Sequence, residues 1–306
     1  MGKERAVFPP ENGGWRKYEG NPVLGNERLG TCFDIYVMED AGEYRMYFSW
    51  RNRKSLAVTT SLDGIAWGEP RIILEPRLET GWEDDLNRNC VVKRGDGYHM
   101  WYTGQAHSQY SWIGYATSQD GFNWKRMSSQ PVLYSERPYE GESVMCPCVL
   151  WDEQAGLWKM WYSAGETYEP NVIAFATSKD GMHWDKQPAN PIFPPSRKHV
   201  YEQERVGACQ VLMRDGWYYL FYIGYEDIDT ARICLARSPD GLTRWQRHPQ
   251  NPIISSTIGS WDADACYKPH VVWQPENQRW LLWYNGRCKA PEYIGLAIHD
   301  GYDLGF

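Results

Sequence analysis

Short apolar runs separated by polar turns recur along the chain, and no stretch shows the 3.6-residue period of a helix. In each unit, a short apolar run is followed by a turn and then by an aromatic run such as His99-Met100-Trp101-Tyr102. A third run is small and apolar, as in Ile173-Ala174-Phe175-Ala176-Thr177. Runs of this length and composition, joined by turns rich in Gly and Asp, predict antiparallel β-strands connected by hairpins.

A repeated phrase after the third run sets the period. Ser-x-Asp-Gly followed by Trp occurs four times, and His299-Asp300-Gly301-Tyr302 is a shortened fifth copy. The aspartates stand at positions 63, 120, 180, 240 and 300, so the steps are 57, 60, 60 and 60 residues. Asp and Gly at these offsets favour a turn, and a fixed period of this size indicates stacked units. The pattern predicts an all-β, five-bladed β-propeller with four antiparallel strands per blade.

The units also predict how the ring closes. We expect a single domain over residues 1–306, with blades at approximately 30–76, 84–133, 142–194, 204–254 and 264–304. The fourth strand of several units ends in a tag such as Asn190-Pro191-Ile192-Phe193, and the last unit lacks this strand. The matching tag, Asn21-Pro22-Val23-Leu24, lies near the start of the chain. An N-terminal strand at about residues 20–25 is therefore predicted to close the last blade.

Composition narrows the range of partners. The 17 Trp and 21 Tyr residues favour strands and can stack on sugars. A net charge of -7 without Lys/Arg runs argues against nucleic acid and anionic membranes. No secretory signal or apolar run of about 18 residues is found, so we expect a cytoplasmic protein with no membrane partner. The sequence leaves the oligomeric state open.

The eight cysteines are expected to be buried thiols rather than disulfides, because the chain is long and carries no export signal. Cys146-Pro147-Cys148 is one residue short of the spacing of a zinc knuckle. No metal site is predicted from it.

The first strand of each propeller blade lines the central channel, and ligands bind at one end of that channel. Alignment of the five first strands by their turns places five different residues in one column: Asp34, Arg88, Cys146, Ala208 and Lys268. A position used only for packing would hold similar residues in every repeat. The divergence favours a binding site, with a solvated channel as the alternative.

An aromatic–acid–x–acid phrase precedes four of the first strands: Trp82-Glu83-Asp84-Asp85, Tyr139-Glu140-Gly141-Glu142, Tyr201-Glu202-Gln203-Glu204 and Trp261-Asp262-Ala263-Asp264. Most of these acids are expected to hold blades together through hydrogen bonds. One or two of them, opposite Asp34, are candidates for glycosyl transfer. That chemistry needs a protonated acid and a carboxylate separated by roughly 5–9.5 Å.

The tags, the Ser-x-Asp-Gly-x-x-Trp turns and the Met-Trp-Tyr strands resemble those of the five-bladed propeller glycosidases, the group that contains glycoside hydrolase families 43, 32 and 130. The resemblance implies a glycoside hydrolase acting on a small oligosaccharide or glycoside, with Asp34 as base or nucleophile. It also implies a proton donor on the third blade, where Glu142 is the carboxylate nearest to Cys146. Glu204 and Asp264 are alternative donors. Arg88 stands where the pattern has an Asp that tunes the acid.

Two other functions remain open. In a glycoside phosphorylase, Arg88, Lys268 and His270 would hold inorganic phosphate, and a non-catalytic carbohydrate-binding propeller is the third reading. Further substrate-binding candidates are Asn89, Trp50, Arg51 and Arg287. No cofactor is expected, although the resemblance implies that a structural calcium ion near the channel axis, beside His270, is an option.

Overall fold

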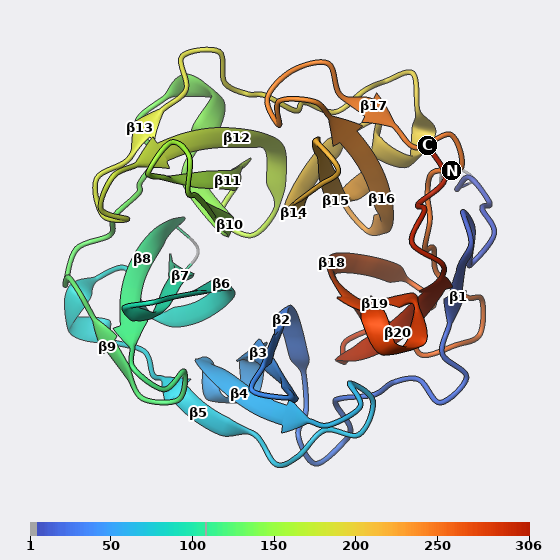
Figure 1. The fold of residues 1–306 in the computed structure, drawn as a ribbon, viewed down its shortest axis with the longest axis horizontal. Helices are drawn as coiled ribbons and strands as arrows, with labels where there is room; N and C mark the ends of the chain where they lie inside the picture. Colours follow the sequence, from blue (N-terminus) through green and yellow to red (C-terminus); the bar gives the residue numbers. More distant parts are fainter. Residues whose placement is uncertain (1–4, 108) are drawn as a thin grey trace.

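The computed structural model describes residues 5–107 and 109–306. Five four-stranded antiparallel sheets are arranged around a central axis (Figure 1). The innermost strands are β2, β6, β10, β14 and β18. The predicted all-β, five-bladed propeller is therefore confirmed.

Each blade runs from a long first strand at the axis to a short outer strand. The strands are β1 (Trp15–Lys17), β2 (Cys32–Asp40), β3 (Glu43–Trp50), β4 (Ser55–Ser61), β5 (Arg71–Leu74), β6 (Asp85–Arg94), β7 (Gly97–Ala106), β8 (Tyr110–Ser118), β9 (Trp124–Arg126), β10 (Ser143–Asp152), β11 (Leu157–Gly165), β12 (Pro170–Ser178), β13 (Asp185–Lys186), β14 (Arg205–Arg214), β15 (Trp217–Asp227), β16 (Thr230–Ser238), β17 (Gln246–Arg247), β18 (Ala265–Gln274), β19 (Arg279–Arg287) and β20 (Glu292–Asp300). The short 3-10 helices are η1 (Arg51–Arg53), η2 (Leu78–Thr80), η3 (Pro138–Glu140), η4 (Val200–Glu202) and η5 (Pro275–Asn277).

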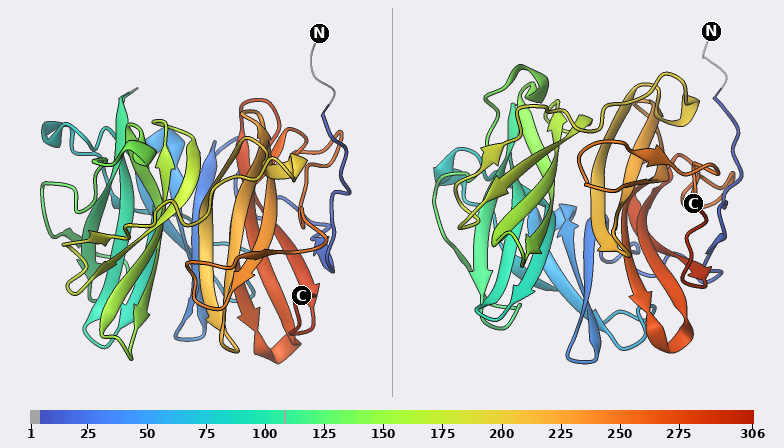
Figure 2. Two further views of the ribbon diagram at one scale, coloured as in Figure 1. Left: turned by 90° about the horizontal axis from the view of Figure 1, so that it is seen from above. Right: turned by 45° about the horizontal axis from the view of Figure 1, so that its top comes forward.

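The last blade is closed by the N-terminal segment, which runs along its outer side (Figures 1 and 2). Strand β1 pairs with β20 and becomes the fourth strand of the sheet. This strand lies at Trp15–Lys17, earlier than the predicted residues 20–25. The tag instead forms a single bridge between Leu24 and Ile294 on the same strand, β20. The predicted closure is therefore correct, but two short segments share the contact.

Every first strand bulges at the same place. Between Phe33–Ser49 and Tyr36–Tyr47, for example, two residues of β2 stand opposite one residue of β3. The first residue of each bulge has a positive φ of 43–53°: Asp34, Arg88, Cys146, Ala208 and Lys268. These are the five residues of the predicted column. Non-glycine residues rarely adopt this conformation, and such backbone often occurs at functional sites.

Four of the five bulges are held by a polar side chain of the preceding blade. The amide N–H of Arg88, for instance, donates to Ser49 Oγ at 3.1 Å. The equivalent acceptors are Asn285 for Asp34, Thr103 for Cys146 and Ser163 for Ala208. The backbone at each of these positions is therefore fixed without help from its own side chain.

The repeated aromatic–acid–x–acid phrase is structural at its first acid. Glu140 is fully buried, accepts a hydrogen bond from Tyr162 at 2.8 Å and pairs with Lys186 on β13 at 2.8 Å. Three other sets repeat this tyrosine–acid–cation contact: Tyr102–Glu83–Arg126, Tyr222–Glu202–Arg247 and Tyr284–Asp262–Lys17. In each set the acid ties the inner part of a blade to its outer strand. The expectation that most of these acids hold the fold together is met at these positions.

The Ser-x-Asp-Gly turns anchor adjacent blades at the end of the ring away from the starts of the first strands. A ring N–H or hydroxyl of one blade donates to the Gly carbonyl of the next blade's turn: Trp283 to Gly64, Tyr47 to Gly121, Trp101 to Gly181 and Trp161 to Gly241, at 2.8–3.1 Å. Within each turn the Asp side chain accepts backbone N–H groups. The motif therefore joins blades as well as reversing the chain.

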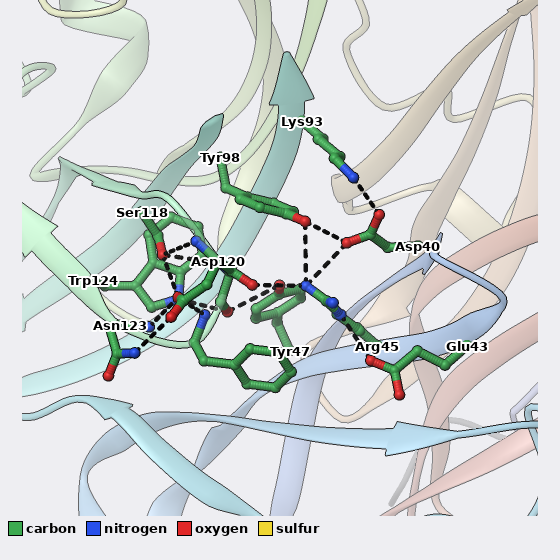
Figure 3. Close-up of polar contacts among 12 residues, drawn as sticks. Asp40, Glu43, Arg45, Tyr47, Lys93, Tyr98, Ser118, Asp120, Asn123 and Trp124 are labelled. Atoms are coloured by element: carbon green, nitrogen blue, oxygen red, sulfur yellow. Dashed lines mark hydrogen bonds and ion pairs between the residues drawn. The ribbon is translucent and has the colours of Figure 1, made fainter. Parts of the chain in front are cut away.

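Figure 3 shows the seam between blades one and two at that end. Asp40 accepts hydrogen bonds from Lys93 and Tyr98 of the second blade and lies 3.0 Å from Arg45 Nη1. The same Arg45 nitrogen donates to the carbonyl of Asp120 at 2.9 Å. One carboxylate and one guanidinium thus link the two blades, and neither is left without a partner.

The hydrophobic core lies between neighbouring blades. Its largest fully buried side chains include Trp82, Trp101, Trp161 and Trp283. All eight cysteines are unbonded and seven are buried, as predicted. Among the described residues, no helix is long and apolar enough to cross a membrane.

Candidate active site

A cavity opens at the end of the channel where the first strands begin. Its lining is formed by Phe33, Asp34, Arg51, Arg88, Cys146, Glu169, Pro170, Ala208, Ile223, Tyr225, Ile228, Asp229, Ala231, Ala265, Tyr267, Arg287 and Glu292. Carboxyl groups, guanidinium groups and tyrosines from several blades therefore meet at one place. A concave site with converging polar groups is the usual form of a small-molecule site.

Asp34 and Arg88 form the floor of this cavity. Arg88 Nε lies 3.4 Å from Asp34 Oδ2, and both side chains are largely buried. A second guanidinium nitrogen of Arg88 donates to the carbonyl of Tyr168 at 2.9 Å. Burial opposes the charge of Arg88, but the Asp34 carboxylate outweighs this and raises the pKa of Arg88. The pair therefore keeps a fixed positive charge beside a carboxylate.

Glu169 approaches from the loop between β11 and β12 of the third blade. Its Oε2 accepts a hydrogen bond from Tyr225 at 3.0 Å. Burial raises the pKa of Glu169, and the charge of Asp34 adds to the rise while Arg88 opposes it. Among the described residues, no cation lies within 4.0 Å of this carboxyl group. Glu169 is thus a carboxyl group whose surroundings favour the protonated form.

Glu292 lies at the start of β20 and is nine-tenths buried. Both of its oxygens accept from Arg51 Nη2, at 3.0 and 3.1 Å. Burial raises the pKa of Glu292, whereas Arg51 and a hydrogen bond from Tyr267 act in the opposite direction. The bound guanidinium makes Glu292 less suited than Glu169 to carry a proton.

The remaining polar lining is provided by Arg287, Asp229 and Cys146. Arg287 Nη2 donates to the backbone carbonyl of Asp229 at 3.2 Å, which holds the guanidinium at the rim. Burial raises the pKa of the Cys146 thiol to about 11, although Arg88 and Lys268 oppose the rise. Cys146 is therefore a neutral thiol near pH 7 and not an activated nucleophile.

Three of the predicted acids lie outside this lining. Glu142 is exposed, and Glu204 is an exposed partner of Arg205 at 3.4 Å. Asp264 is half-buried and accepts the N–H of Lys289 at 2.5 Å in an adjoining hollow. Of the four predicted catalytic carboxylates, Asp34 is the one that lines the cavity.

The predicted substrate-binding residues are divided between two ends of the channel. Arg51, Arg88 and Arg287 line the cavity. Trp50 donates its ring N–H to Leu29 O at 2.7 Å, outside the lining. His270 lines a groove at the opposite end of the channel, whereas buried Lys268 and Asn89 line neither hollow. The proposed phosphate cluster of Arg88, Lys268 and His270 is therefore not assembled at the cavity.

The surroundings of His270 do not suit a calcium ion. Calcium takes oxygen ligands, mostly carboxylates and carbonyls, whereas the charged group acting on His270 is the ammonium of Lys268. Among the described residues, no three His, Cys, Asp or Glu side chains are grouped so that they could hold a metal ion. We derive no role for a metal here.

Glu169 and Glu292 were missed by sequence analysis because they do not belong to the repeated phrases. Both stand in or beside loops between second and third strands, and these loops differ from blade to blade. Propeller loops at the channel mouth commonly carry function. An acid immediately before a third strand is the signal that could have found them.

A five-bladed propeller with carboxyl and guanidinium groups gathered at one channel mouth defines a carbohydrate-active propeller. The chain belongs to glycosyl hydrolases family 43, whose sequence model matches residues 20–303. This confirms the resemblance to propeller glycosidases and singles out one of the three families.

Several relatives cover most of the chain. It is 31% identical to the uncharacterized protein Rv1502 of Mycobacterium tuberculosis, over 93% of the chain and 98% of that protein. It is 26% identical to a β-1,2-mannobiose phosphorylase of Thermoanaerobacter sp., over 76% of the chain and 96% of that enzyme. The structure of a thermostable family-43 glycoside hydrolase superposes with a TM-score of 0.72 at 18% identity, covering 90% of the chain and 91% of that structure. The last similarity concerns the fold.

Proposed function

We propose that the protein hydrolyses a glycosidic bond in a small oligosaccharide or glycoside, with Asp34 as base or nucleophile and Glu169 as proton donor. The observation that carries this proposal is the pairing of two differently placed carboxyl groups in one cavity. Arg88 places a positive charge beside Asp34, while burial raises the pKa of Glu169. Two carboxyl groups whose surroundings favour opposite protonation states are what glycoside cleavage requires.

The other lining residues have supporting roles in this proposal. Tyr225 orients Glu169 through its hydrogen bond, so that the proton faces a defined direction. Arg51 and Glu292 form a charged pair that can hold sugar hydroxyl groups. Phe33 and Tyr267 supply ring surfaces of the kind on which sugars stack.

The test is a set of amide variants measured on aryl-glycosides and short oligosaccharides. Asp34→Asn and Glu169→Gln should each lower kcat by about 10²–10⁴-fold, the range for a positioned acid or base. Glu142→Gln, which removes an exposed acid on the same blade, is the matched control and should keep near-normal kcat. Full activity in both Asp34→Asn and Glu169→Gln would refute the assignment.

Phosphorolysis is the second candidate, and the identity to phosphorylases specifically favours it. Within the cavity, inorganic phosphate would meet Arg51, Arg88 and Arg287, since guanidinium groups bind phosphate in a bidentate manner. Turnover that requires inorganic phosphate and releases a sugar 1-phosphate would establish this reaction. Equal turnover with and without phosphate, releasing the free sugar, would establish hydrolysis. Saturable sugar binding without any product would favour a binding propeller.

A further inference from the structure

Lys268 is a buried cation without a counter-charge. Its side chain is 3% exposed, and it occupies the bulge of β18 at a φ of 51°. No described residue offers it a hydrogen bond, and no described carboxylate lies within 4.0 Å of it. The groups on which its charge acts are His270 and four thiols, those of Cys90, Cys146, Cys148 and Cys209.

His270, two residues further along β18, presents a second buried donor. Its Nδ1 lies 3.3 Å from the backbone N of Val37 and accepts that N–H. In the neutral ring the proton must then be on Nε2. Burial and the charge of Lys268 both lower the pKa of His270, so the ring is neutral near pH 7. The Nε2–H group has no partner and the side chain is 3% exposed.

These two groups lack the same thing, a negatively charged acceptor. Burying an unpaired charge or an unpaired N–H group is strongly unfavourable, and buried polar groups without partners in native structures often mark an ion or water that completes them. A cation would be repelled by Lys268. We propose that the axial channel of this propeller binds a monovalent inorganic anion, of the halide class, between Lys268 and His270.

The ligand has a route to this place that does not pass through the candidate active site. His270 also lines the groove at the opposite end of the channel, together with Tyr36 and Gln210. The proposed anion site is therefore separate from the cavity at the mouth, and it does not rest on the proposed glycosidase activity.

Cys148 offers the main alternative counter-charge. A hydrogen bond from the Cys90 thiol, with a smaller effect of Lys268, lowers the pKa of Cys148. A thiolate at this position would neutralise Lys268 and leave no place for an external anion. Water is a further occupant. Both alternatives predict no dependence on the identity of the salt, so one experiment separates them from a halide.

The full-length protein is unfolded thermally in sodium chloride and in sodium gluconate at equal ionic strength, because gluconate is too bulky for a buried site. A ligand at about 100-fold excess over its Kd should raise the Tm in chloride by about 2–5 °C. Lys268→Met should abolish the difference between the two salts. Lys179→Met, which removes an exposed lysine in a turn, is the matched control and should retain it.

A second measurement does not depend on any variant folding. Crystals of the unaltered protein soaked in sodium bromide should show anomalous scattering on the channel axis beside Lys268 and His270. Equal Tm values in the two salts together with no bromide on the axis would overturn the proposal and leave water or the Cys148 thiolate as the occupant.

Discussion

At the scale of single residues, the site depends on which side chains project from equivalent backbone positions. Asp34 and Arg88 begin the same bulge on adjacent blades, and their contact at 3.4 Å follows from that equivalence. Glu169 is different, because it comes from a loop that only the third blade has in this form. The proposed reaction therefore combines a residue of the repeat with a residue outside it.

The environment of Glu169 predicts the pH dependence of turnover. Because burial raises the pKa of Glu169, its protonated form should persist to higher pH than that of an ordinary glutamate, and activity should fall as pH rises through this pKa. Glu169→Gln should remove that alkaline limb as well as lowering kcat. The measurement is kcat/KM against pH for both proteins. An unchanged alkaline limb in Glu169→Gln would assign the proton to another group.

At the scale of elements, the tyrosine–acid–cation contact explains how a two- or three-residue outer strand is retained. In the last blade, the cation is Lys17 of β1, which lies 2.5 Å from the buried Asp262. Lys17 also donates to Ser255 O and Thr257 Oγ1. Three short hydrogen bonds on one ammonium thus attach the N-terminal segment to a blade made by the other end of the chain.

Adjacent residues of β1 give a matched test of this contact. Lys17→Met leaves Asp262 buried and unpaired, so it should lower the free energy of unfolding by about 3–5 kcal/mol. Arg16→Ala removes an ion pair with Asp300 in which both side chains are mostly exposed, and such pairs contribute about 0–1 kcal/mol. Urea unfolding of the two variants measures the difference. Similar losses in both would show that Asp262 does not depend on Lys17.

At the scale of the whole molecule, the ring is closed by segments far apart in sequence. Strand β1 and the bridge at Leu24 both attach to β20, and Trp283 of the last blade donates to Gly64 of the first. Opening the ring at one place should therefore weaken all of its blade contacts.

A truncation tests this closure. A chain that starts at Gly25 loses β1, the tag and Lys17, and it should unfold at a clearly lower temperature or fail to fold as a monomeric ring. A chain that starts at Arg5 keeps every contact described here and should match the full-length protein. Calorimetry gives the Tm of each. An unchanged Tm in the shorter chain would contradict the role of the N-terminal segment.

The repeat also decided what could be predicted from sequence. Its fixed period aligned the five first strands, so the column containing Asp34 and Arg88 was found from residue positions alone. Glu169 and Glu292 could not be found in this way, because they stand where the repeats differ. The period also gave no depth along the axis, and so it grouped Lys268 and His270 with Arg88 although they do not line the cavity.

The shared bulge has a consequence for how such a protein can change over evolutionary time. At four of the five bulges the backbone is held by a side chain of the preceding blade, so the local shape does not depend on the resident side chain. A carboxylate, a guanidinium, a thiol and a methyl group occupy these four positions on one common backbone. Each blade thus offers an interchangeable position facing the ligand, and new specificities can arise by single replacements there without rebuilding the ring.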